Sequence, residues 1–312
     1  MDPSSALRVA VSGAGGLIGS ALVRRLTADG HTVVPLVRRT PATGEIGWDP
    51  EAGRLDARDL QGIDAIIHLA GENIGVRWTP ARKARILASR VKGTRLLSEA
   101  VGRMRNPPRA MISASAVGIY GDRGDEILTE DSSLGPADDF LVATGQQWEA
   151  AADAARAAGI RVIHPRFGLV LSGKGGALGR MLLPFRLGIG GRLGRGSQWM
   201  SWISIDDVVG ALVFLMANEG AIGPVNVTSP APVRNHEFTR TLGRVLSRPA
   251  IVPVPSLGLR LVFGEMADAA LLASTRAVPQ RLLELGFRFQ HTSLEAALRE
   301  VLRKDSRATF RS

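Results

Sequence analysis

Short apolar runs alternate with longer amphipathic segments along the first 170 residues of the chain. The apolar runs, rich in β-branched and aliphatic residues, are Leu7–Val11, 31–39, 63–71, 109–116 and 160–171. Between them, apolar positions recur with helical spacing in residues 20–30, Pro80–Gly102 and Phe140–Ala158. Buried strands that alternate with crossover helices are typical of parallel sheets. The pattern therefore predicts an α/β fold with a doubly wound parallel sheet of the Rossmann type.

The composition of the chain changes at about Lys174. Gly and Arg become frequent, and a Pro-rich stretch, RPAIVPVPSLG, leads into mostly helical sequence. The segment GPVNVTS has the character of a late strand of the first sheet. We expect a Rossmann domain at 1–173, rejoined by roughly 203–230, and a smaller, mostly helical substrate lobe formed by 174–202 and 231–303. Residues 304–312 are expected to form a basic tail.

The composition excludes several chemistries. The chain has no cysteine, which rules out disulfides, thiolate metal ligands and a cysteine nucleophile. Its five histidines show no metal-ligand spacing, so no metal site is predicted. The start MDPSSALRVAV lacks the pattern of a signal peptide, and the longest helical apolar run, Val208–Ala217, is far shorter than the roughly 20 residues of a membrane span. We expect a cytoplasmic protein that does not enter a membrane.

The formal net charge of +10 and the pI of about 11.1 raise the question of nucleic-acid binding. The basic residues are mostly arginines spread along the chain, without aromatic side chains interleaved among them. This distribution argues against a nucleic-acid interface and favours a compositional bias, in which a few arginines serve an anionic small molecule.

A glycine-rich turn lies between the first predicted strand and the first predicted helix. In AVSGAGGLIGSAL, Gly13, Gly16 and Gly19 follow one another at three-residue intervals. Such a turn brings the backbone close to a pyrophosphate and presents the N–H groups of a helix N-terminus to it. Its place at the start of a βαβ unit favours dinucleotide binding over a purely structural turn, although Ile18 breaks the stricter G-x-G-x-x-G spacing. The predicted contacts are Gly13, Ala14, Gly16, Leu17, Ile18 and Gly19.

The end of the second predicted strand selects between the two nicotinamide dinucleotides. An acidic residue there would bind the ribose 2′-hydroxyl of NAD. The strand instead runs into Arg38 and Arg39, with no carboxylate before Glu45. Guanidinium groups suit a 2′-phosphate through bidentate bonds, so we expect NADP(H) as the cofactor. A solvated basic edge is the alternative.

Longer phrases of the chain resemble the extended and atypical short-chain dehydrogenases/reductases, a superfamily that includes nucleoside-diphosphate-sugar epimerases. The phrases include GAGGLIGSAL, HLAGENI, SASAVGIYG, RFGLVLSGKGGALGRMLLPF and QWMSWISIDDVV. They occur in order over nearly the whole chain. More closely, the chain is similar to an epimerase-like family with a small C-terminal domain of the DUF1731 type, some of whose members are labelled cell-division inhibitor homologues.

The resemblance implies further contacts with the cofactor, from the loop after the fourth strand, from the next helix and from the segment after the sixth strand. In that order they are His68, Leu69, Ala70 and Gly71, then Ser89, then Pro165 and Arg166. Ordinary packing at the strand end is the alternative role of His68. Arg90, beside Ser89, stands where sugar epimerases often carry Asn, and its role stays open.

The usual acid–base pair of the superfamily is absent. Its members use a Tyr and a Lys to exchange a proton at the substrate oxygen, which a Ser holds. When Glu149 serves as the anchor, Leu141 and Gly145, or Phe140 and Thr144, occupy the Tyr and Lys places. Apart from the weak threonine hydroxyl, none of these side chains exchanges a proton.

Three residues remain as candidates for the chemistry. Ser115 in SASAVGIYG resembles the strand-end serine, although a register based on the YG pair places Ala116 there. Tyr120 is the one tyrosine of the chain and is a candidate acid, with the lining of a pocket as its alternative role. Glu72, just after HLAG, is the other titratable group nearby, and a loop hydrogen bond is its alternative.

The stretch PFRLGIGGRLGRGSQWMSWISIDDVV, rich in Gly, Arg and Trp, is a predicted lid over the substrate. Arg186, Arg192 and Arg195 are candidate clamps for a diphosphate or a carboxylate, and Trp199 and Trp202 are candidates for stacking on a ring. Turn formation by the glycines and packing of the tryptophans between the lobes are the alternatives.

Two functions stay open. The first is an NADP-dependent oxidoreductase or epimerase that acts on a sugar-nucleotide-like or other anionic small molecule through non-standard acid–base groups. The second is an NADP(H)-binding sensor or regulatory protein with little or no turnover. The glycine turn and the arginine-rich lid favour binding of a cofactor and a second ligand, whereas the missing Tyr and Lys favour the sensor. We favour the enzyme slightly, because a sensor has no evident need for the second lobe; the sequence does not specify the oligomeric state.

Overall fold

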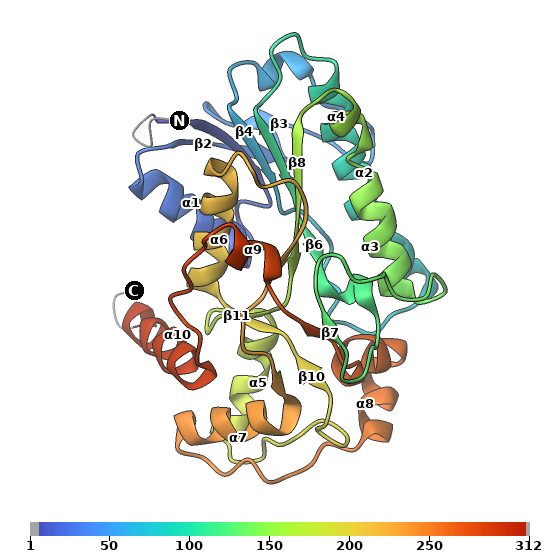
Figure 1. Cartoon of the computed structure of the whole chain (residues 1–312), viewed down its shortest axis with the longest axis vertical. Helices are drawn as coiled ribbons and strands as arrows, with labels where there is room; N and C mark the ends of the chain where they lie inside the picture. Colours follow the sequence, from blue (N-terminus) through green and yellow to red (C-terminus); the bar gives the residue numbers. More distant parts are fainter. Residues whose placement is uncertain (1–5, 310–312) are drawn as a thin grey trace.

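A parallel β-sheet forms the centre of the protein in the computed structural model, which describes residues 6–309 (Figure 1). Its strands, in spatial order, are β12 (Gly223–Val227), β8 (Arg161–Phe167), β5 (Ala110–Ser113), β4 (Ala65–His68), β1 (Arg8–Ser12), β2 (Thr32–Val37) and β3 (Ile46–Gly47). These neighbours all run parallel, and the short β6 (Ser115–Ala116) pairs with the end of β8. The strand order reverses beside β1, which confirms the predicted Rossmann-type sheet.

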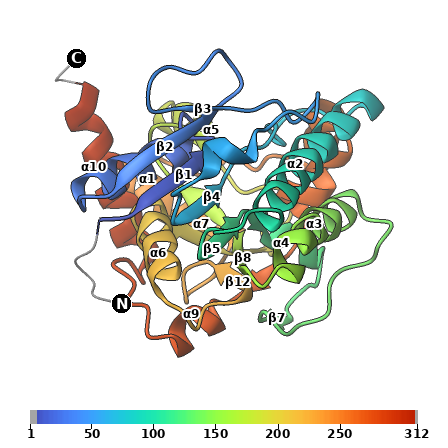
Figure 2. The ribbon, with the colours of Figure 1, turned by 90° about the horizontal axis from the view of Figure 1, so that it is seen from above.

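Helices cover both faces of this sheet (Figure 2). α1 (Leu17–Ala28) and α6 (Ile205–Ala217) pack together on one face. α2 (Pro80–Gly102), α3 (Phe140–Ala150) and α4 (Asp153–Ala157) pack together on the other. The sheet is therefore buried between two helical layers, as crossover connections between parallel strands require.

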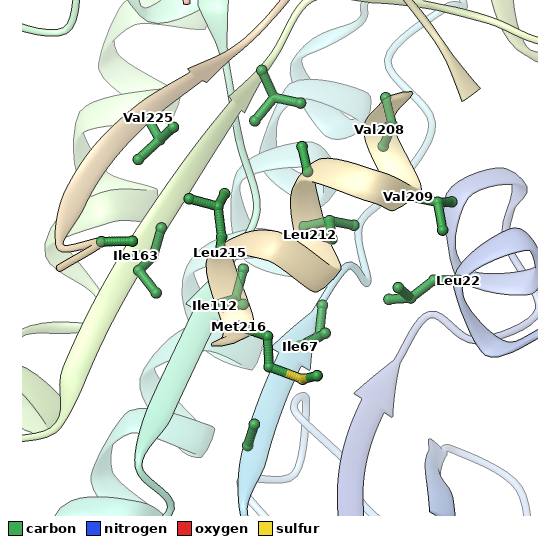
Figure 3. Packing of buried hydrophobic residues seen from close by; sticks show 14 of the residues in the cluster. Leu22, Ile67, Ile112, Ile163, Val208, Val209, Leu212, Leu215, Met216 and Val225 are labelled. Carbon is green, nitrogen blue, oxygen red and sulfur yellow. The ribbon is translucent and has the colours of Figure 1, made fainter. Parts of the chain in front are cut away.

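Each central strand supplies two hydrophobic cores because successive side chains point to opposite faces. In β4, Ile67 packs with Leu22 of α1 and Leu212 of α6 (Figure 3). Its neighbour Ile66 packs on the opposite face, in the core that α2 covers. All four side chains are fully buried. Burial on both faces explains why the strands appear in the sequence as nearly continuous apolar runs.

A smaller and mostly helical lobe lies below the sheet in Figure 1, as predicted. Its main helices are α5 (Gly176–Arg186), α7 (Asn235–Leu246), α8 (Ser256–Phe263) and α10 (Leu294–Thr309). α5, α7 and α10 share one hydrophobic core, to which they contribute Leu182, Phe238 and Leu298. The segment GPVNVTS supplies β12, so the chain returns to the first sheet where the sequence predicts a late strand.

Short elements connect the sheet to this lobe. Within the described residues, three two-stranded ladders pair β9 (Leu169–Leu171) with β11 (Trp202–Ser204), β10 (Trp199–Met200) with β13 (Val233–Arg234), and β7 (Ile127–Leu128) with β14 (Arg276–Ala277). The short helical turns are Ala57–Leu60, Val117–Tyr120, the π-helical Ala267–Leu272, and α9 (Gln280–Glu284), which packs on β12.

Two predicted elements are wrong in extent. The predicted helix Phe140–Ala158 is divided into α3 and α4, because the hydroxyl of Ser98 accepts the N–H of Ala155 at 2.7 Å in place of a helical carbonyl. The predicted strand 160–171 is divided into β8 and β9. The chain leaves the sheet at Gly168, where a Cβ would lie 2.2 Å from a neighbouring backbone oxygen.

The two ends of the chain are described only in part. α10 continues to Thr309, into the segment 304–312 that the sequence predicts as a basic tail. Residues 310–312 of this tail and residues 1–5 of the predicted first domain lie outside the described residues. Across residues 6–309, no helix combines the length and the apolarity needed to cross a membrane.

Candidate functional site

The glycine turn joins the C-terminal end of β1 to the N-terminus of α1. Gly13 has a φ of +69°, and a Cβ there would lie 2.9 Å from the backbone nitrogen of Ala70. A Cβ at Gly19 would lie 2.0 Å from the carbonyl oxygen of Gly13, so both positions require glycine. Gly16 is the N-cap of α1 and makes no side-chain cap bond, which leaves the first N–H groups of the helix available to an anion. The predicted contacts Gly13, Ala14, Gly16, Leu17, Ile18 and Gly19 all lie in this turn.

His68 holds the loop after β4 against this turn. Its imidazole is fully buried, with Nδ1 2.5 Å from Ser12 Oγ and its ring edge-on to Trp48, at 5.6 Å between the ring centroids. The same hydroxyl accepts the N–H of Leu69 at 3.2 Å. Burial lowers the pKa of His68 to about 4, so the ring is neutral near pH 7. His68 therefore positions the Leu69–Gly71 loop as an uncharged group.

Arg90 on α2 places a positive charge beside the same loop. A Cβ added at Gly71 would lie 3.4 Å from its Cζ, and the guanidinium stacks on Trp148 of α3, 5.0 Å from the ring centroid. One N–H donates to the carbonyl of Ile86 at 3.1 Å. Burial lowers the pKa of Arg90 to about 10, and the opposing attraction of Glu72 is smaller. In the part of the chain that the structure describes, no carboxylate forms an ion pair with Arg90.

Ser89 and Glu72 tie this loop to α2. The Ser89 hydroxyl accepts the N–H of Glu72 at 3.0 Å and donates to the carbonyl of Ile86 at 2.9 Å. The Glu72 carboxylate pairs with Arg82, and the two side chains are 35% and 31% exposed. Solvent and small solutes therefore reach the Glu72 carboxylate, which sets it apart from the buried acids nearby.

A surface pocket of about 320 Å³ lies at the C-terminal end of β2. Arg38, Arg39 and Arg54 belong to its lining, together with three carboxylates, those of Asp49, Asp56 and Asp59. Arg39 donates two bonds to Glu45, at 2.6 and 2.7 Å, so this carboxylate neutralises part of the basic charge. The pocket lies at the same edge of the sheet as the glycine turn, because β2 is the neighbour of β1.

A second cavity, of about 390 Å³, adjoins the glycine turn. Gly16 and Leu17 line it from α1, and Lys174 and Gly176 line it where α5 begins. Lys174 is not among the predicted site residues. In the sequence, Lys174 lies in the stretch SGKGG, directly before a helical segment. In the structure this stretch leads into α5, so Lys174 lies beside the N-terminus of a second helix.

Ser115, Tyr120 and Arg166 meet in one buried network at the ends of β6 and β8. The guanidinium of Arg166 bonds both oxygens of Glu149, at 2.8 and 2.9 Å, and donates to the Tyr120 hydroxyl at 2.9 Å. Ser115 donates to Glu149 Oε1 at 2.7 Å. The Tyr120 hydroxyl lies 2.8 Å from Asn226 Oδ1, and the side chain is fully buried. All five side chains are therefore engaged with one another.

The protonation states of Tyr120 and Glu149 do not change near neutral pH. Burial raises the pKa of Tyr120 and outweighs the attraction of Arg166. Burial also raises the pKa of Glu149, but the bonds from Arg166 are stronger and hold the net pKa below its ordinary value. The phenol stays protonated and the carboxylate stays charged, so neither group is suited to exchange a proton with a ligand.

The α3 positions expected for the missing Tyr and Lys are closely packed. Leu141 belongs to an apolar cluster with Trp78 of the loop before α2 and Met266 of the segment after α8. A Cβ at Gly145 would lie 2.9 Å from Ile119 Cγ1. In the other register, Phe140 packs in the same cluster, and the Thr144 hydroxyl is buried without a hydrogen-bond partner among the described residues. In either register, no Tyr or Lys stands at these positions.

The two tryptophans of the predicted lid contact protein groups. Trp199 lies between the guanidinium groups of Arg234 and Arg276, at 4.7 and 4.1 Å from its ring centroid. Its Nε1–H donates to Asp125 at 2.8 Å. Trp202 is fully buried and donates to a backbone carbonyl at 2.8 Å.

The predicted arginine clamps lie away from the glycine turn. Arg186 is the last residue of α5, about 15 Å along the helix from its start beside that turn, at 1.5 Å per residue. Arg192 is exposed and donates to the carbonyl of Arg195 at 2.9 Å. The structure thus gathers the glycine turn, the β4 loop, Ser89 and Arg90, whereas Ser115, Tyr120, Pro165 and Arg166 form the buried ends of β6 and β8.

Known proteins match this chain over almost its full length. It is 45% identical over 292 residues to epimerase family protein Mb2239 of Mycobacterium bovis, a match that covers 93% of this chain and 96% of that protein. It is 39% identical over 301 residues to the human epimerase family protein SDR39U1, with 95% of this chain and 100% of that protein covered.

Solved structures share the fold. The crystal structure of human SDR39U1 (isoform 2) with NADPH has a TM-score of 0.87 and 37% identity to this chain, and the match covers 95% of this chain and 99% of that one. MoeE5 in complex with UDP-glucuronic acid and NAD has a TM-score of 0.75 and 26% identity, with 96% and 99% covered.

The sequence patterns of two families divide the chain. That of the NAD dependent epimerase/dehydratase family matches residues 9–228, from β1 to the end of β12. That of the domain of unknown function DUF1731 matches residues 254–301, from the start of α8 into α10. These matches confirm the resemblance seen in the sequence: the chain belongs to the NAD dependent epimerase/dehydratase family and carries a C-terminal DUF1731 domain.

Proposed function

We propose that this protein binds NADP(H) and transfers hydride to or from an anionic small molecule, as an oxidoreductase or epimerase of its family. The observation that carries the proposal is the arrangement of the Arg38–Arg39 pocket, the glycine turn and the β4 loop along one edge of the sheet. The Arg38 and Arg39 side of the pocket suits a 2′-phosphate, and the turn suits a pyrophosphate. The structure of the human relative with NADPH supports this choice of cofactor.

Arg90 adds an anion contact to this cofactor site. Its guanidinium lies beside Gly71, is largely desolvated and bonds only the carbonyl of Ile86 among the described groups. A desolvated cation without a carboxylate partner gains free energy when a phosphate approaches it. We assign Arg90 to the pyrophosphate side of the dinucleotide.

The proton for the substrate oxygen comes from a group other than the usual pair. Leu141 and Gly145, or in the other register Phe140 and Thr144, stand at the expected positions. The hydroxyls of Ser115 and Tyr120 are engaged within the protein. Glu72 is a partly exposed acid at the end of the β4 loop. We therefore assign proton exchange to Glu72 in the enzymatic function.

Binding of NADP(H) without turnover is the second candidate function. The close apolar packing of Leu141 and Gly145 favours this function, because these residues cannot serve as the acid–base pair that the family uses for chemistry. A sensor needs a cofactor site but no proton donor at a substrate oxygen.

Calorimetric titration with NADP, NADPH, NAD and NADH tests the cofactor assignment. We expect NADPH to bind at least tenfold more tightly than NADH, and Arg38→Asp to remove this preference by weakening NADPH binding. Arg299→Asp, an exposed change of the same charge on α10, serves as the control and should leave the preference intact. Equal affinity of the wild-type protein for NADP and NAD contradicts the assignment.

Nicotinamide absorbance with pooled sugar nucleotides and anionic carbonyl compounds tests the reaction. Product analysis of the same samples is needed, because an epimerase regenerates its cofactor. Turnover that falls at least tenfold in Glu72→Gln while NADPH affinity persists supports the enzyme. Tight NADPH binding with neither absorbance change nor product establishes the sensor.

A further inference from the structure

Large exposed apolar side chains gather on the C-terminal lobe. Among the described residues, eight of the eleven exposed large hydrophobic side chains lie in two segments, 183–189 and 251–262. They are Leu183, Leu187, Ile189, Ile251, Val252, Leu257, Leu261 and Val262, each at least 45% exposed. Single exposed apolar residues are ordinary in soluble proteins, but a concentration of them marks a binding surface.

Contacts join these two segments and the loop 73–78 into a closed ring. Arg180 on α5 donates to the carbonyl of Gly75, and Arg77 of the same loop donates to a carbonyl of α8. At the other ends of the two helices, the N–H of Val252 bonds to the carbonyl of Gly190 at 3.3 Å. The ring therefore runs through the loop, α5, residues 187–192, residues 251–255 and α8. We call it the apolar ring. In Figure 1, α5 and α8 lie below the sheet.

Helical spacing places the exposed side chains on faces that border the apolar ring. Leu183 on α5 and Leu187, the C-cap of this helix, follow Arg180 by three and seven positions, so they lie on the side from which Arg180 reaches the loop. On α8, Leu257 and Leu261 are four positions apart and share one face. The loop in the ring directly follows Glu72, so the ring is continuous with the proposed cofactor site.

Positive charge accompanies the apolar side chains. Arg77 and Arg180 donate to backbone carbonyls, and Arg186 is exposed at the end of α5. Within residues 6–304, whose side chains are described, none of the three pairs with a carboxylate. The acids next to α8, Glu265 and Asp268, are already bonded to basic side chains. The ring thus offers apolar contact area together with unneutralised cations.

We propose that the apolar ring binds the substrate, and that this substrate is an amphiphilic anion with a long aliphatic chain and a single carboxylate or phosphate head group. The assignment rests on the proposed function for the chemistry: a carbonyl carbon of such a molecule accepts hydride from NADPH, its oxygen accepts a proton, and an alcohol and NADP⁺ result. The exposed aliphatic side chains offer apolar contact to a hydrocarbon chain, whereas they give no hydrogen bonds to the hydroxyls of a sugar.

Displacement of a fluorescent amphiphilic anion, 1-anilinonaphthalene-8-sulfonate, from the full-length protein tests the proposal. We expect dodecanoate, below the concentration at which it forms micelles, to displace the dye far more effectively than hexanoate, by up to about fourfold for each added methylene. UDP-glucose at the same concentration should displace little. Displacement by UDP-glucose, or equal potency of the two carboxylates, overturns the proposal.

Paired surface variants locate the binding site. Leu183→Gln with Leu187→Gln, and Leu257→Gln with Leu261→Gln, should each weaken dodecanoate binding at least tenfold. Ile222→Gln, which changes an apolar residue exposed to 62% elsewhere, is the matched control and should change nothing. These are exposed positions, so folding is retained, and an unchanged thermal transition verifies this.

The competing occupants of the ring give distinct results. A wild-type dimer that the Leu183/Leu187 variant converts to a monomer in light scattering overturns the proposal in favour of self-association. Sedimentation with vesicles of phosphatidylcholine and phosphatidylglycerol overturns it in favour of a membrane surface. Dye displacement is measured without NADPH, so dodecanoate binding to the ring is separable from a failure of the cofactor assignment.

Discussion

Arg166 and Arg90 are both withdrawn from solvent near the C-terminal edge of the sheet, but they differ in their partners. Arg166 is 4% exposed and bonds Glu149 twice and Tyr120 once. Burial lowers its pKa, yet the bonds to Glu149 outweigh this effect and raise the pKa overall. Arg90 has the ring of Trp148 and one backbone carbonyl, and burial lowers its pKa to about 10.

The difference separates a structural charge from a ligand-binding charge. A buried cation with a complete set of partners stabilises the fold only while those partners remain. A buried cation without a carboxylate costs solvation free energy in the empty protein, and an anionic ligand offsets that cost. Arg166 therefore has the environment of a structural charge, whereas Arg90 has the environment expected of the ligand-binding residue proposed above.

Removal of Arg166 gives the largest expected effect and tests the structural half of the comparison. Arg166→Met leaves Glu149 charged and 14% exposed, with Ser115 as its remaining partner. We expect the free energy of unfolding, measured by urea denaturation, to fall by about 3–5 kcal/mol. The double variant with Glu149→Gln removes the stranded charge and should recover more than half of the loss.

A surface ion pair provides the control for this variant. Arg25 and Asp29 lie one turn apart on α1 with side chains 45% and 31% exposed. Arg25→Met should cost less than about 1 kcal/mol. Equal losses in the Arg166 and Arg25 variants would show that the buried network is not structural.

His68 adds to this comparison a buried titratable group that is neutral near pH 7. Its pKa is about 4 in the folded protein and 6.5 ordinarily, so between these values the unfolded chain binds a proton that the folded chain does not. Stability is therefore lost as the pH falls from 6.5 to 4, by about 3 kcal/mol in total. In His68→Gln, urea denaturation should show a shallower loss of stability over this range. His236→Gln, at an exposed histidine, should keep the wild-type slope, and an identical slope in all three proteins would contradict the assignment.

The sheet and the glycine turn were predictable because local physics determines them. Strands buried on both faces must be apolar at nearly every position, so runs such as 63–71 stand out in the sequence. Gly13 and Gly19 are required by close backbone contacts that any chain with this turn shares.

The sequence could not predict which arginine pairs with a carboxylate, because the partners are distant in the sequence. Arg166 meets Glu149 and Tyr120, 17 and 46 residues away, only when β8, α3 and the turn after β6 assemble. The direction of Ser115 depends in the same way on a two-residue strand that turns its hydroxyl to Glu149. A sequence pattern gives the residue types at such a site but not the pairs they form.

Removal of Arg90 tests the ligand-binding half of the comparison. Arg90→Met removes a charge that pairs with no carboxylate among the described side chains, so the free energy of unfolding should stay the same or rise. If a phosphate of NADPH pairs with Arg90, calorimetry should show NADPH affinity reduced about ten- to hundredfold, the value of a hydrogen bond to a charged group. Arg85→Met, an exposed change on the same helix, is the control for net charge and should bind NADPH normally. Equal NADPH affinity in both variants would remove Arg90 from the cofactor site.

Tyr120→Phe gives the smallest expected effect. It decides whether the buried network around Arg166 and Glu149 takes any part in chemistry. The change removes a hydroxyl that accepts from Arg166 and lies 2.8 Å from Asn226 Oδ1, and leaves the ring in its buried place. We expect a loss of about 1–2 kcal/mol in the free energy of unfolding, with NADPH affinity within about twofold of the wild-type value. Turnover of any substrate found should also persist, because a fully buried phenol with a raised pKa does not reach a ligand. Lost turnover with unchanged stability and NADPH affinity would instead make Tyr120 the missing acid, and the distinction between a structural and a ligand-binding charge would then fail at this network.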